Sequence, residues 1–377
     1  MIIAIPKETH PDEKRVCFIP SSVDRLVKKG AQVIVETGLG ATIGATDDDY
    51  KKAGAQVEAN RQNLLSNADI VLRLRKLPAA EIPSLKSGSI HISFLDPFNE
   101  RSLVDGLAQY NISAISMEMI PRTTRAQKMD ALSSQANLAG YVTVVLAAER
   151  LPKIFPMMMT PAGTISPARV FIIGAGVAGL QAIATAKRLG ARVDAFDTRP
   201  VVKEQVQSLG AKFVEIDLGE TGQTKDGYAK ALTPEQLEKQ RAGMAKVCSQ
   251  SDVVITTAQL FGRRAPVVLT KDMVAQMKPG TIIVDMAVES GGNVEGSKVN
   301  EEVVTANGVR IIGLGNLPGR VAVHASQMYS ANLHNLLEEY WDKDAKAFKL
   351  NAEDDIIKGC LITHGGKIVN PILIKGT

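Results

Sequence analysis

Cysteine, histidine and aromatic residues are all scarce in this 377-residue chain, and their scarcity excludes several classes of function. The three cysteines, Cys17, Cys248 and Cys360, contain no Cys-x-x-Cys pair, so we expect buried thiols in a reducing compartment and no disulfide framework. The five histidines form no His-Glu-x-x-His pattern, so no metal site is expected. Aromatic residues make up 4% of the chain and the net charge is only +4, which argues against nucleic acid as a partner.

Long uninterrupted apolar runs are also missing. The N-terminal apolar stretch ends at Pro6 and no basic region precedes it, unlike an export signal. Two uncharged windows, 131–148 and 170–186, approach membrane length, but polar residues interrupt the first and glycines the second. We therefore expect a soluble chain without direct membrane insertion, which a partner could still hold at a membrane.

Short apolar runs alternate with amphipathic stretches, a pattern that predicts an α/β fold with parallel sheets. In the N-terminal third of the chain, strands are expected at 2–5, 32–36, 69–74, 89–95 and 112–117, and helices at 21–29, 47–53 and 101–109. Further along, strands are expected at 170–173, 192–197, 212–216, 252–257, 281–285 and 309–313, and helices at 177–189, 201–209, 235–250 and 271–277. Long helices are expected at 130–150 and 322–340, and a hairpin at 360–369.

This order predicts two Rossmann-like, doubly wound parallel-sheet domains that flank a cleft and are joined by the long helices. The first domain would combine residues 1–131 with 320–377, and the second would span 132–319. Prolines between 152 and 167 mark a connector that could form a hairpin. The polar segment 217–232 contains three glycines and is expected to be an exposed, mobile loop.

The strongest local motif is Gly-Ala-Gly-Val-Ala-Gly from residue 174 to 179, which follows an apolar strand and opens a helix. That context is what a dinucleotide-binding turn requires. Gly174 would permit the tight turn, Gly176 the approach of a pyrophosphate, and Gly179 the close packing of helix on strand. The amides that begin the helix, including those of Val177 and Ala178, would face the phosphates.

An acidic residue, Asp197, ends the second strand of this domain, 23 residues after Gly174. A carboxylate there accepts hydrogen bonds from the ribose hydroxyls and repels a 2′-phosphate, which favours NAD(H) over NADP(H). Thr198 and Arg199 follow it, and the arginine weakens this preference because it could neutralise a phosphate. The alternative for Asp197 is a helix N-cap.

A polar loop, 121–130, lies between a strand and the first long helix. Arg122, Gln127 and Asp130 supply donors and an acceptor close together, and Ser133 follows in the helix. Such a loop could approach a cofactor. From the residues alone, however, a solvated connector is the better interpretation.

Taken together, these motifs make the whole chain resemble the family of alanine dehydrogenase and of the NAD(H)-binding component of proton-translocating nicotinamide nucleotide transhydrogenase. Shared stretches include Ile-Pro-Lys-Glu at 5–8, the glycine motif and the segment 285–292. The transhydrogenase component is more similar than the dehydrogenase. Its signatures are Met-Glu-Met-Ile-Pro-Arg at 117–122, Arg-Ala-Gln at 125–127, Ser-Ser-Gln at 133–135 and Phe-Pro-Met-Met-Met-Thr at 155–160.

Departures from alanine dehydrogenase indicate the same choice. Asp96 stands where that family has its catalytic histidine, Arg75 where it has a substrate-binding lysine, and Glu289 where it has an aspartate. Arg15 alone is retained. Because an amino-acid dehydrogenase needs a general base, a self-contained enzyme of that kind is the second hypothesis. A catalytically silent NAD-sensing module is the third.

The resemblance implies a Re/Si-specific, proton-translocating NAD(P)+ transhydrogenase that is catalytic only with its partner subunits. This chain would bind NAD(H), and hydride would pass directly to NADP(H) on a β subunit. Arg122, Gln127, Asp130 and Ser133 would line the nicotinamide end, with Asn316 near it, and Tyr228 would lie in a mobile loop that closes over NAD(H).

The resemblance also implies how the chain is assembled and where it acts. Another subunit would span the membrane and translocate protons, and the chain would be peripheral on the cytoplasmic face of the inner membrane. Two copies would form a homodimer by exchanging a hairpin at 152–167. The chain would be either a separate α1 subunit or a truncated α chain.

Overall fold

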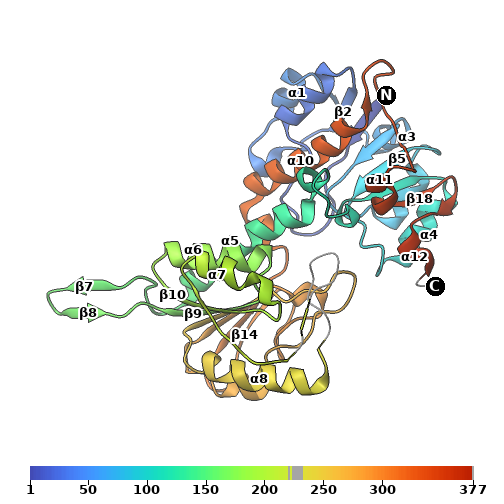
Figure 1. Cartoon of the computed structure of the whole chain (residues 1–377). Coiled ribbons are helices and arrows are strands. Elements are labelled where there is room, and N and C mark those ends of the chain that lie inside the picture. Colours follow the sequence, from blue (N-terminus) through green and yellow to red (C-terminus); the bar gives the residue numbers. More distant parts are fainter. Residues whose placement is uncertain (220, 223–231, 376–377) are drawn as a thin grey trace. The chain divides into compact units, whose positions relative to one another are not determined.

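The computed structural model describes residues 1–219, 221–222 and 232–375 (Figure 1). Their contacts divide the chain into two compact units: unit 1 comprises Met1–Gln135 and Gly319–Thr377, and unit 2 comprises Ala136–Pro318. The domain boundaries expected from the sequence remain a proposal beside this division. Each unit is built on a mainly parallel sheet with helices, which confirms the predicted α/β fold class.

The sheet of unit 1 has eight strands in the order β19-β18-β6-β5-β4-β1-β2-β3. The strands are β1 (Ile2–Ile5), β2 (Gln32–Glu36), β3 (Gln56–Glu58), β4 (Ile70–Leu72), β5 (Ile90–Ser93), β6 (Ser113–Ser116), β18 (Leu361–His364) and β19 (Lys367–Ile368). β1 to β6 pair in parallel, and the hairpin β18–β19 adds antiparallel to β6. Because β2 and β4 flank β1, the chain reverses its winding between β1 and β4.

The helices of unit 1 follow the same alternation. They are α1 (Pro20–Lys28), α2 (Asp47–Lys52), α3 (Arg61–Ser66), α4 (Arg101–Gln109), α10 (Ala322–Glu339), α11 (Asp355–Cys360) and α12 (Pro371–Lys375). A short antiparallel pair, β16 (Trp341–Asp342) and β17 (Ala347–Phe348), follows α10. The sequence analysis missed β3 and α3, since segments of three and six residues are too short to display a period.

The first long helix, α5 (Ala131–Arg150), confirms the helix expected at 130–150. Its residues up to Gln135 are counted with unit 1 and the rest with unit 2. By length and composition alone it is the helix of the described chain that could cross a membrane, and half of its most apolar window is buried within the protein.

The sheet of unit 2 has seven strands in the order β11-β10-β9-β12-β13-β15-β14. They are β9 (Arg169–Ile173), β10 (Arg192–Phe196), β11 (Lys212–Phe213), β12 (Val253–Thr256), β13 (Ile282–Asp285), β14 (Glu301–Val304) and β15 (Arg310–Gly313). The six parallel strands match those predicted. The seventh, β14, was not predicted and pairs antiparallel with β15 at one edge.

Helices cover both faces of this sheet: α6 (Val177–Arg188), α7 (Lys203–Ser208), α8 (Pro234–Cys248) and α9 (Lys271–Ala275). Ile172 of β9 belongs to a buried apolar cluster with residues of α5, α6 and α7. The neighbouring Phe171 points into a second cluster with residues of α8 and α9. Successive side chains thus serve opposite faces, as expected of a strand buried on both sides.

A two-stranded hairpin, β7 (Met158–Thr160) and β8 (Gly163–Ile165), precedes β9 and projects away from the sheet of unit 2 (Figure 1). All six strand residues are exposed. Met157 is 60% exposed and Met159 75% exposed. The connector that the prolines indicated is therefore a hairpin with an apolar, uncovered surface.

Candidate nucleotide-binding site

The glycine turn of unit 2 lies where the chain reverses its winding, between β9 and β12. Gly174 has φ +100°, a conformation that side chains rarely adopt, and a Cβ atom on it would lie 2.5 Å from the Oγ1 of Thr257. A Cβ atom on Gly179 would lie 1.9 Å from the carbonyl oxygen of Gly174. At Gly176 the nearest atom to a Cβ would be a guanidinium nitrogen of Arg199, 3.9 Å away. The first and third glycines are thus required by packing, whereas the second keeps the backbone accessible.

The N-terminus of α6 opens at this turn. Gly176 is its N-cap and provides no side-chain cap, and the first intrahelical bond runs from the Leu180 amide to the Gly176 carbonyl at 2.8 Å. The amides of Val177, Ala178 and Gly179 precede that bond and have no helical acceptor. Uncapped amides at the positive end of a helix dipole bind phosphate oxygens.

Asp197 follows β10 directly and is almost completely buried. Its Oδ2 accepts the Ala175 amide at 2.7 Å and a guanidinium N–H of Arg199 at 2.7 Å. Its Oδ1 accepts the Arg199 amide at 2.8 Å and Arg199 Nε at 2.9 Å. Since α7 has Val202 as its N-cap, Asp197 does not cap that helix, and its carboxylate instead ties β10 to the glycine turn. The carbonyl of Thr198 accepts the hydroxyl of Thr221 at 2.7 Å.

The last predicted residue of unit 2, Asn316, has φ +46° after β15. Its amide donates to Glu289 Oε2 at 3.0 Å. The preceding Gly315 amide donates to Asn300 Oδ1 at 3.0 Å. Glu289, which stands where alanine dehydrogenase has an aspartate, therefore holds backbone here. Tyr228 lies outside the described residues.

Sequence reasoning missed a buried carboxylate–amide pair at the same edge of this sheet. Asp285, which ends β13, accepts the amides of Ala287 at 3.0 Å and of Asn293 at 3.0 Å. The Asn293 side chain in turn binds both the amide (3.0 Å) and the carbonyl (2.8 Å) of Ala258 after β12. An acidic residue closing a strand, as at Asp197, was the signal that could have found it.

In unit 1, the predicted residues Asp130 and Ser133 form the N-terminal cap of α5. Asp130 Oδ1 accepts the Ser133 amide at 2.9 Å, and Oδ2 accepts its hydroxyl at 2.6 Å. Arg122 Nε lies 4.0 Å from Asp130 Oδ2. Gln127 is exposed, and no hydrogen-bond partner for its side chain is found among the described residues. The structure thus brings Arg122, Asp130 and Ser133 together and leaves the Gln127 amide available.

Other side chains anchor the loop that carries these residues. Arg125 donates to both oxygens of Asp354, at 2.6 and 2.5 Å, and the Tyr340 hydroxyl donates to Asp354 Oδ1 at 2.6 Å. Burial would raise the pKa of Asp354, but the hydrogen bonds from Tyr340 and Arg125 outweigh it and hold that pKa at about 2. Lys128 binds Glu339 at 2.8 Å. The backbone around Gln127 is consequently fixed without using Gln127 itself.

The residues that align with the alanine dehydrogenase site lie in a charged cluster of unit 1. Arg15 binds Glu13 with two nitrogens, at 2.8 and 2.7 Å, and Arg75 Nε binds the same carboxylate at 2.8 Å. Burial acts to raise the pKa of Glu13, but Arg15 and then Arg75 lower it to about 2. Asp96, with φ +52°, donates its amide to Glu118. A carboxylate therefore stands where that family requires an imidazole base.

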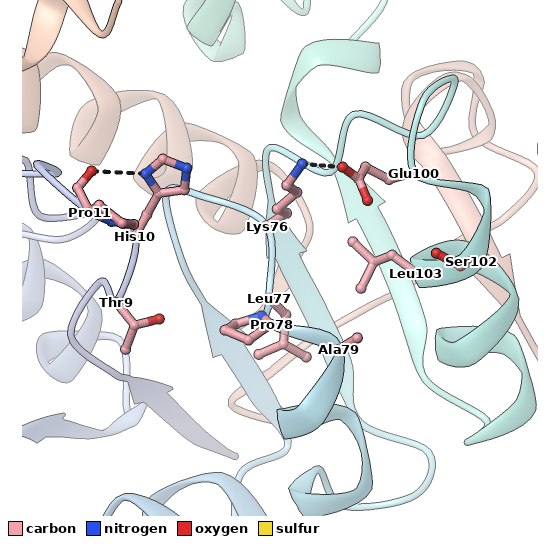
Figure 2. A pocket seen from close by; sticks show the side chains of 10 residues that line it. All are labelled: Thr9, His10, Pro11, Lys76, Leu77, Pro78, Ala79, Glu100, Ser102 and Leu103. Atoms are coloured by element: carbon pink, nitrogen blue, oxygen red, sulfur yellow. Dashed lines mark hydrogen bonds and ion pairs between the residues drawn. The ribbon is translucent and has the colours of Figure 1, made fainter. Parts of the chain in front are cut away.

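A cavity of about 310 Å³ lies in unit 1 beyond the ends of β1 and β4 (Figure 2). An ion pair between Lys76 and Glu100 crosses its mouth, and His10 Nδ1 lies 3.0 Å from the Pro11 carbonyl. Its lining consists of Thr9, His10, Pro11, Lys76, Leu77, Pro78, Ala79, Glu100, Ser102 and Leu103. This set includes none of the site residues predicted from the sequence.

The cysteines and the acidic residues form no further site in the portion of the chain that the structure describes. No group of three His, Cys, Asp or Glu side chains there is arranged to hold a metal ion. Cys17, Cys248 and Cys360 are free and buried. Burial raises the pKa of Cys248 and Cys360 to about 12 and that of Cys17 well above its usual value.

The chain matches both domains of one protein family. The family model described as alanine dehydrogenase/PNT, N-terminal domain, matches residues 4–139, and the corresponding C-terminal domain matches residues 143–371. The chain is also 45% identical over 380 aligned positions to an NAD(P) transhydrogenase subunit alpha chain of Rhodospirillum rubrum, covering 99% of each chain.

A solved structure and a second kind of relative complete the comparison. The crystal structure of transhydrogenase from Sinorhizobium meliloti superposes with a TM-score of 0.88 at 44% identity, over 98% of this chain and all of the other. Alanine dehydrogenase of Halomonas elongata is 30% identical over 98% of this chain and 94% of its own length. The similarity is therefore higher, at equal coverage, to the transhydrogenase chains.

Proposed function

Because the chain belongs to the alanine dehydrogenase/PNT family, we propose that it is the NAD(H)-binding α component of a proton-translocating NAD(P) transhydrogenase. In this role it positions NADH while hydride passes directly to NADP+ on a partner subunit. The observation that carries the proposal is the glycine turn, because only its second glycine has open space before it. That is where a pyrophosphate must approach the backbone.

The residues of unit 2 fit NAD(H) in three respects. The open backbone at Gly176 and the uncapped amides of Val177 and Ala178 suit the pyrophosphate. Asp197 offers a carboxylate to the adenosine ribose and disfavours a 2′-phosphate. When bound, NADH supplies the hydride, so the chain itself has to bind and orient. Asn316, held by Glu289, is proposed to lie near the nicotinamide.

At the nicotinamide end we assign the roles that the resemblance suggests to Arg122, Gln127, Asp130 and Ser133. No proton leaves a hydroxyl or an amine in a transfer between two nicotinamide rings, so this chain needs no general base. It needs correct placement, which can supply roughly 7–11 kcal/mol of a bimolecular barrier. A loop anchored by Arg125 and Lys128 that leaves Gln127 available is suited to that task.

The partners proposed are an NADP(H)-binding β subunit and a membrane-spanning subunit that translocates protons. The chain would be peripheral on the cytoplasmic face of the inner membrane and would act only in this complex. A homodimer is proposed through the hairpin β7–β8. Its exposed Met157, Met158 and Met159 are flexible apolar side chains that adapt well to a partner surface.

A mixing experiment tests the proposal. The purified chain is incubated with NADH and a thio-NADP+ or acetylpyridine analogue, with and without an NADP(H)-binding component of a transhydrogenase. Reduction of the analogue only after mixing is the expected result. Formation of NADH from alanine by the chain alone would instead establish an alanine dehydrogenase. Tight NADH binding without either activity would indicate an NAD-sensing module.

A further inference from the structure

All four acceptor positions of the Asp197 carboxylate are occupied. An ionised carboxylate has about two acceptor positions on each oxygen. On Oδ1 these are taken by the amide and Nε of Arg199, at 2.8 and 2.9 Å. On Oδ2 they are taken by the Ala175 amide and a terminal guanidinium N–H of Arg199, both at 2.7 Å. Asp197 therefore has no position left for a ribose hydroxyl.

Two of these four donors can be exchanged and two cannot. The amides of Ala175 and Arg199 belong to the backbone of the glycine turn and of the segment after β10. Nε and the terminal N–H belong to one flexible side chain, and each occupies one position on a different oxygen. If the Arg199 side chain leaves, one acceptor position opens on each oxygen, which is the number that the 2′- and 3′-hydroxyls require.

We propose that Arg199 is a displaceable positioning residue: its guanidinium occupies the ribose positions of Asp197 until the cofactor replaces it. This inference rests on the proposed NAD(H) site. Because a nearly buried carboxylate is costly to leave unpaired, the guanidinium keeps Asp197 charged and oriented in the free protein. The side chains are only 6% (Asp197) and 14% (Arg199) exposed, so water could not do this equally well.

The position of the guanidinium gives the displaced side chain a second task. A terminal nitrogen of Arg199 lies 3.9 Å from where a Cβ on Gly176 would be, beside the backbone proposed for the pyrophosphate. A short rotation moves its charge from the carboxylate toward the phosphates. Binding then exchanges one set of hydrogen bonds for another, so ribose recognition adds little net affinity. Such an exchange suits a cofactor that has to be released after each turnover.

An uncharged probe isolates this competition from the attraction between Arg199 and phosphate. Adenosine and 2′,3′-dideoxyadenosine are titrated in competition with NADH against wild type, Arg199→Ala and Arg199→Gln. The expected result is adenosine binding about tenfold tighter in both variants, equivalent to about 1.4 kcal/mol. Dideoxyadenosine, which has no hydroxyl for Asp197, should be unchanged. Arg188→Ala, the same charge change on the exposed end of α6, serves as the control.

A double-mutant cycle ties the effect to Asp197. In an Asp197→Asn background, Arg199→Ala should leave adenosine affinity unchanged. Unaltered or weaker adenosine binding in Arg199→Gln, an equal gain for dideoxyadenosine, or a gain that persists in the Asp197→Asn background would each overturn the inference. Should wild type bind no NADH at all, the proposed function fails instead. Binding of NADH by wild type with no response to Arg199 substitution rejects only the role of Arg199.

Discussion

Gly179 and Gly174 touch more closely than any side chain would allow: a Cβ on Gly179 would lie 1.9 Å from the Gly174 carbonyl oxygen. The first turn of α6 rests on the turn before it. We expect Gly179→Ala to shift the helix, to lower the free energy of unfolding by about 1–3 kcal/mol, and to weaken NADH binding. Urea unfolding and calorimetric titration measure the two effects.

Gly176→Ala is the matched control for this pair. A Cβ there meets nothing closer than the Arg199 guanidinium at 3.9 Å, and the backbone conformation of Gly176 is open to alanine. Stability should stay within about 0.5 kcal/mol of wild type. NADH affinity should nevertheless fall at least tenfold because the methyl group occupies the approach of the pyrophosphate. If both variants changed stability equally, the distinction between the two glycines would be wrong.

Cofactor choice should depend on Asp197. Wild type is expected to bind NADH well and NADPH poorly, because the carboxylate repels a 2′-phosphate. Asp197→Ala removes this repulsion and releases Arg199, so the preference for NADH should weaken markedly. Parallel titrations with NADH and NADPH measure it. Equal affinity of wild type for both cofactors would contradict the assignment.

Gln127→Asn should slow hydride transfer without disturbing the fold. The loop is held by Arg125 and Lys128, whereas Gln127 is exposed, so unfolding and much of the NADH affinity should be unchanged. Small misplacements of reacting groups can cost ~100-fold, which is the loss expected here. Single-turnover stopped-flow with the NADP(H) component present isolates the transfer step. A wild-type rate would return this loop to the role of a solvated connector.

The anchor at Asp354 should make stability depend on acid pH. Tyr340 and Arg125 lower the pKa of Asp354 from 3.8 to about 2. A lowered pKa contributes stability that is complete above pH 4 and is lost as the pH falls toward 2. Because Arg125 is half exposed, we expect Asp354→Asn to cost about 1 kcal/mol at pH 7. Urea unfolding should show this difference shrinking between pH 4 and 2, and a constant difference would contradict the assignment.

A negative charge on the hairpin should disrupt the proposed dimer. Met159 is 75% exposed, so Met159→Asp should leave the isolated chain folded but introduce an unpaired carboxylate into an apolar contact. Sedimentation at several concentrations should then show a shift toward monomer. Gln207→Asp, the same charge change on an exposed position of α7, should behave like wild type. A dimer that tolerates Met159→Asp would exclude the hairpin as its contact.

Patterns of long period were readable in the sequence. The six parallel strands of unit 2 were found because buried parallel strands are continuous apolar runs. The glycine turn was found because its three glycines have separate steric reasons. β14 was missed, since Glu301–Val304 alternates only weakly and lies at an edge where one neighbour suffices.

Side-chain partners were less predictable than elements. Asp130 with Ser133 three residues later reads as a helix cap, yet its functional interpretation came from the resemblance alone. The anchor between Arg125 and Asp354 joins residues 229 positions apart, and no local pattern reports such a contact. The saturation of Asp197 by Arg199 likewise depends on rotamers that the sequence leaves open.

The burial of every cysteine has a practical consequence. Thiols whose pKa is raised to about 12 or beyond hold almost no thiolate near neutral pH, so maleimides and iodoacetamides should leave Cys17, Cys248 and Cys360 unmodified in the folded chain. One new cysteine on the hairpin could then be labelled uniquely with a spin probe or a fluorophore. Spectroscopy could report on that segment during turnover without first removing the native thiols.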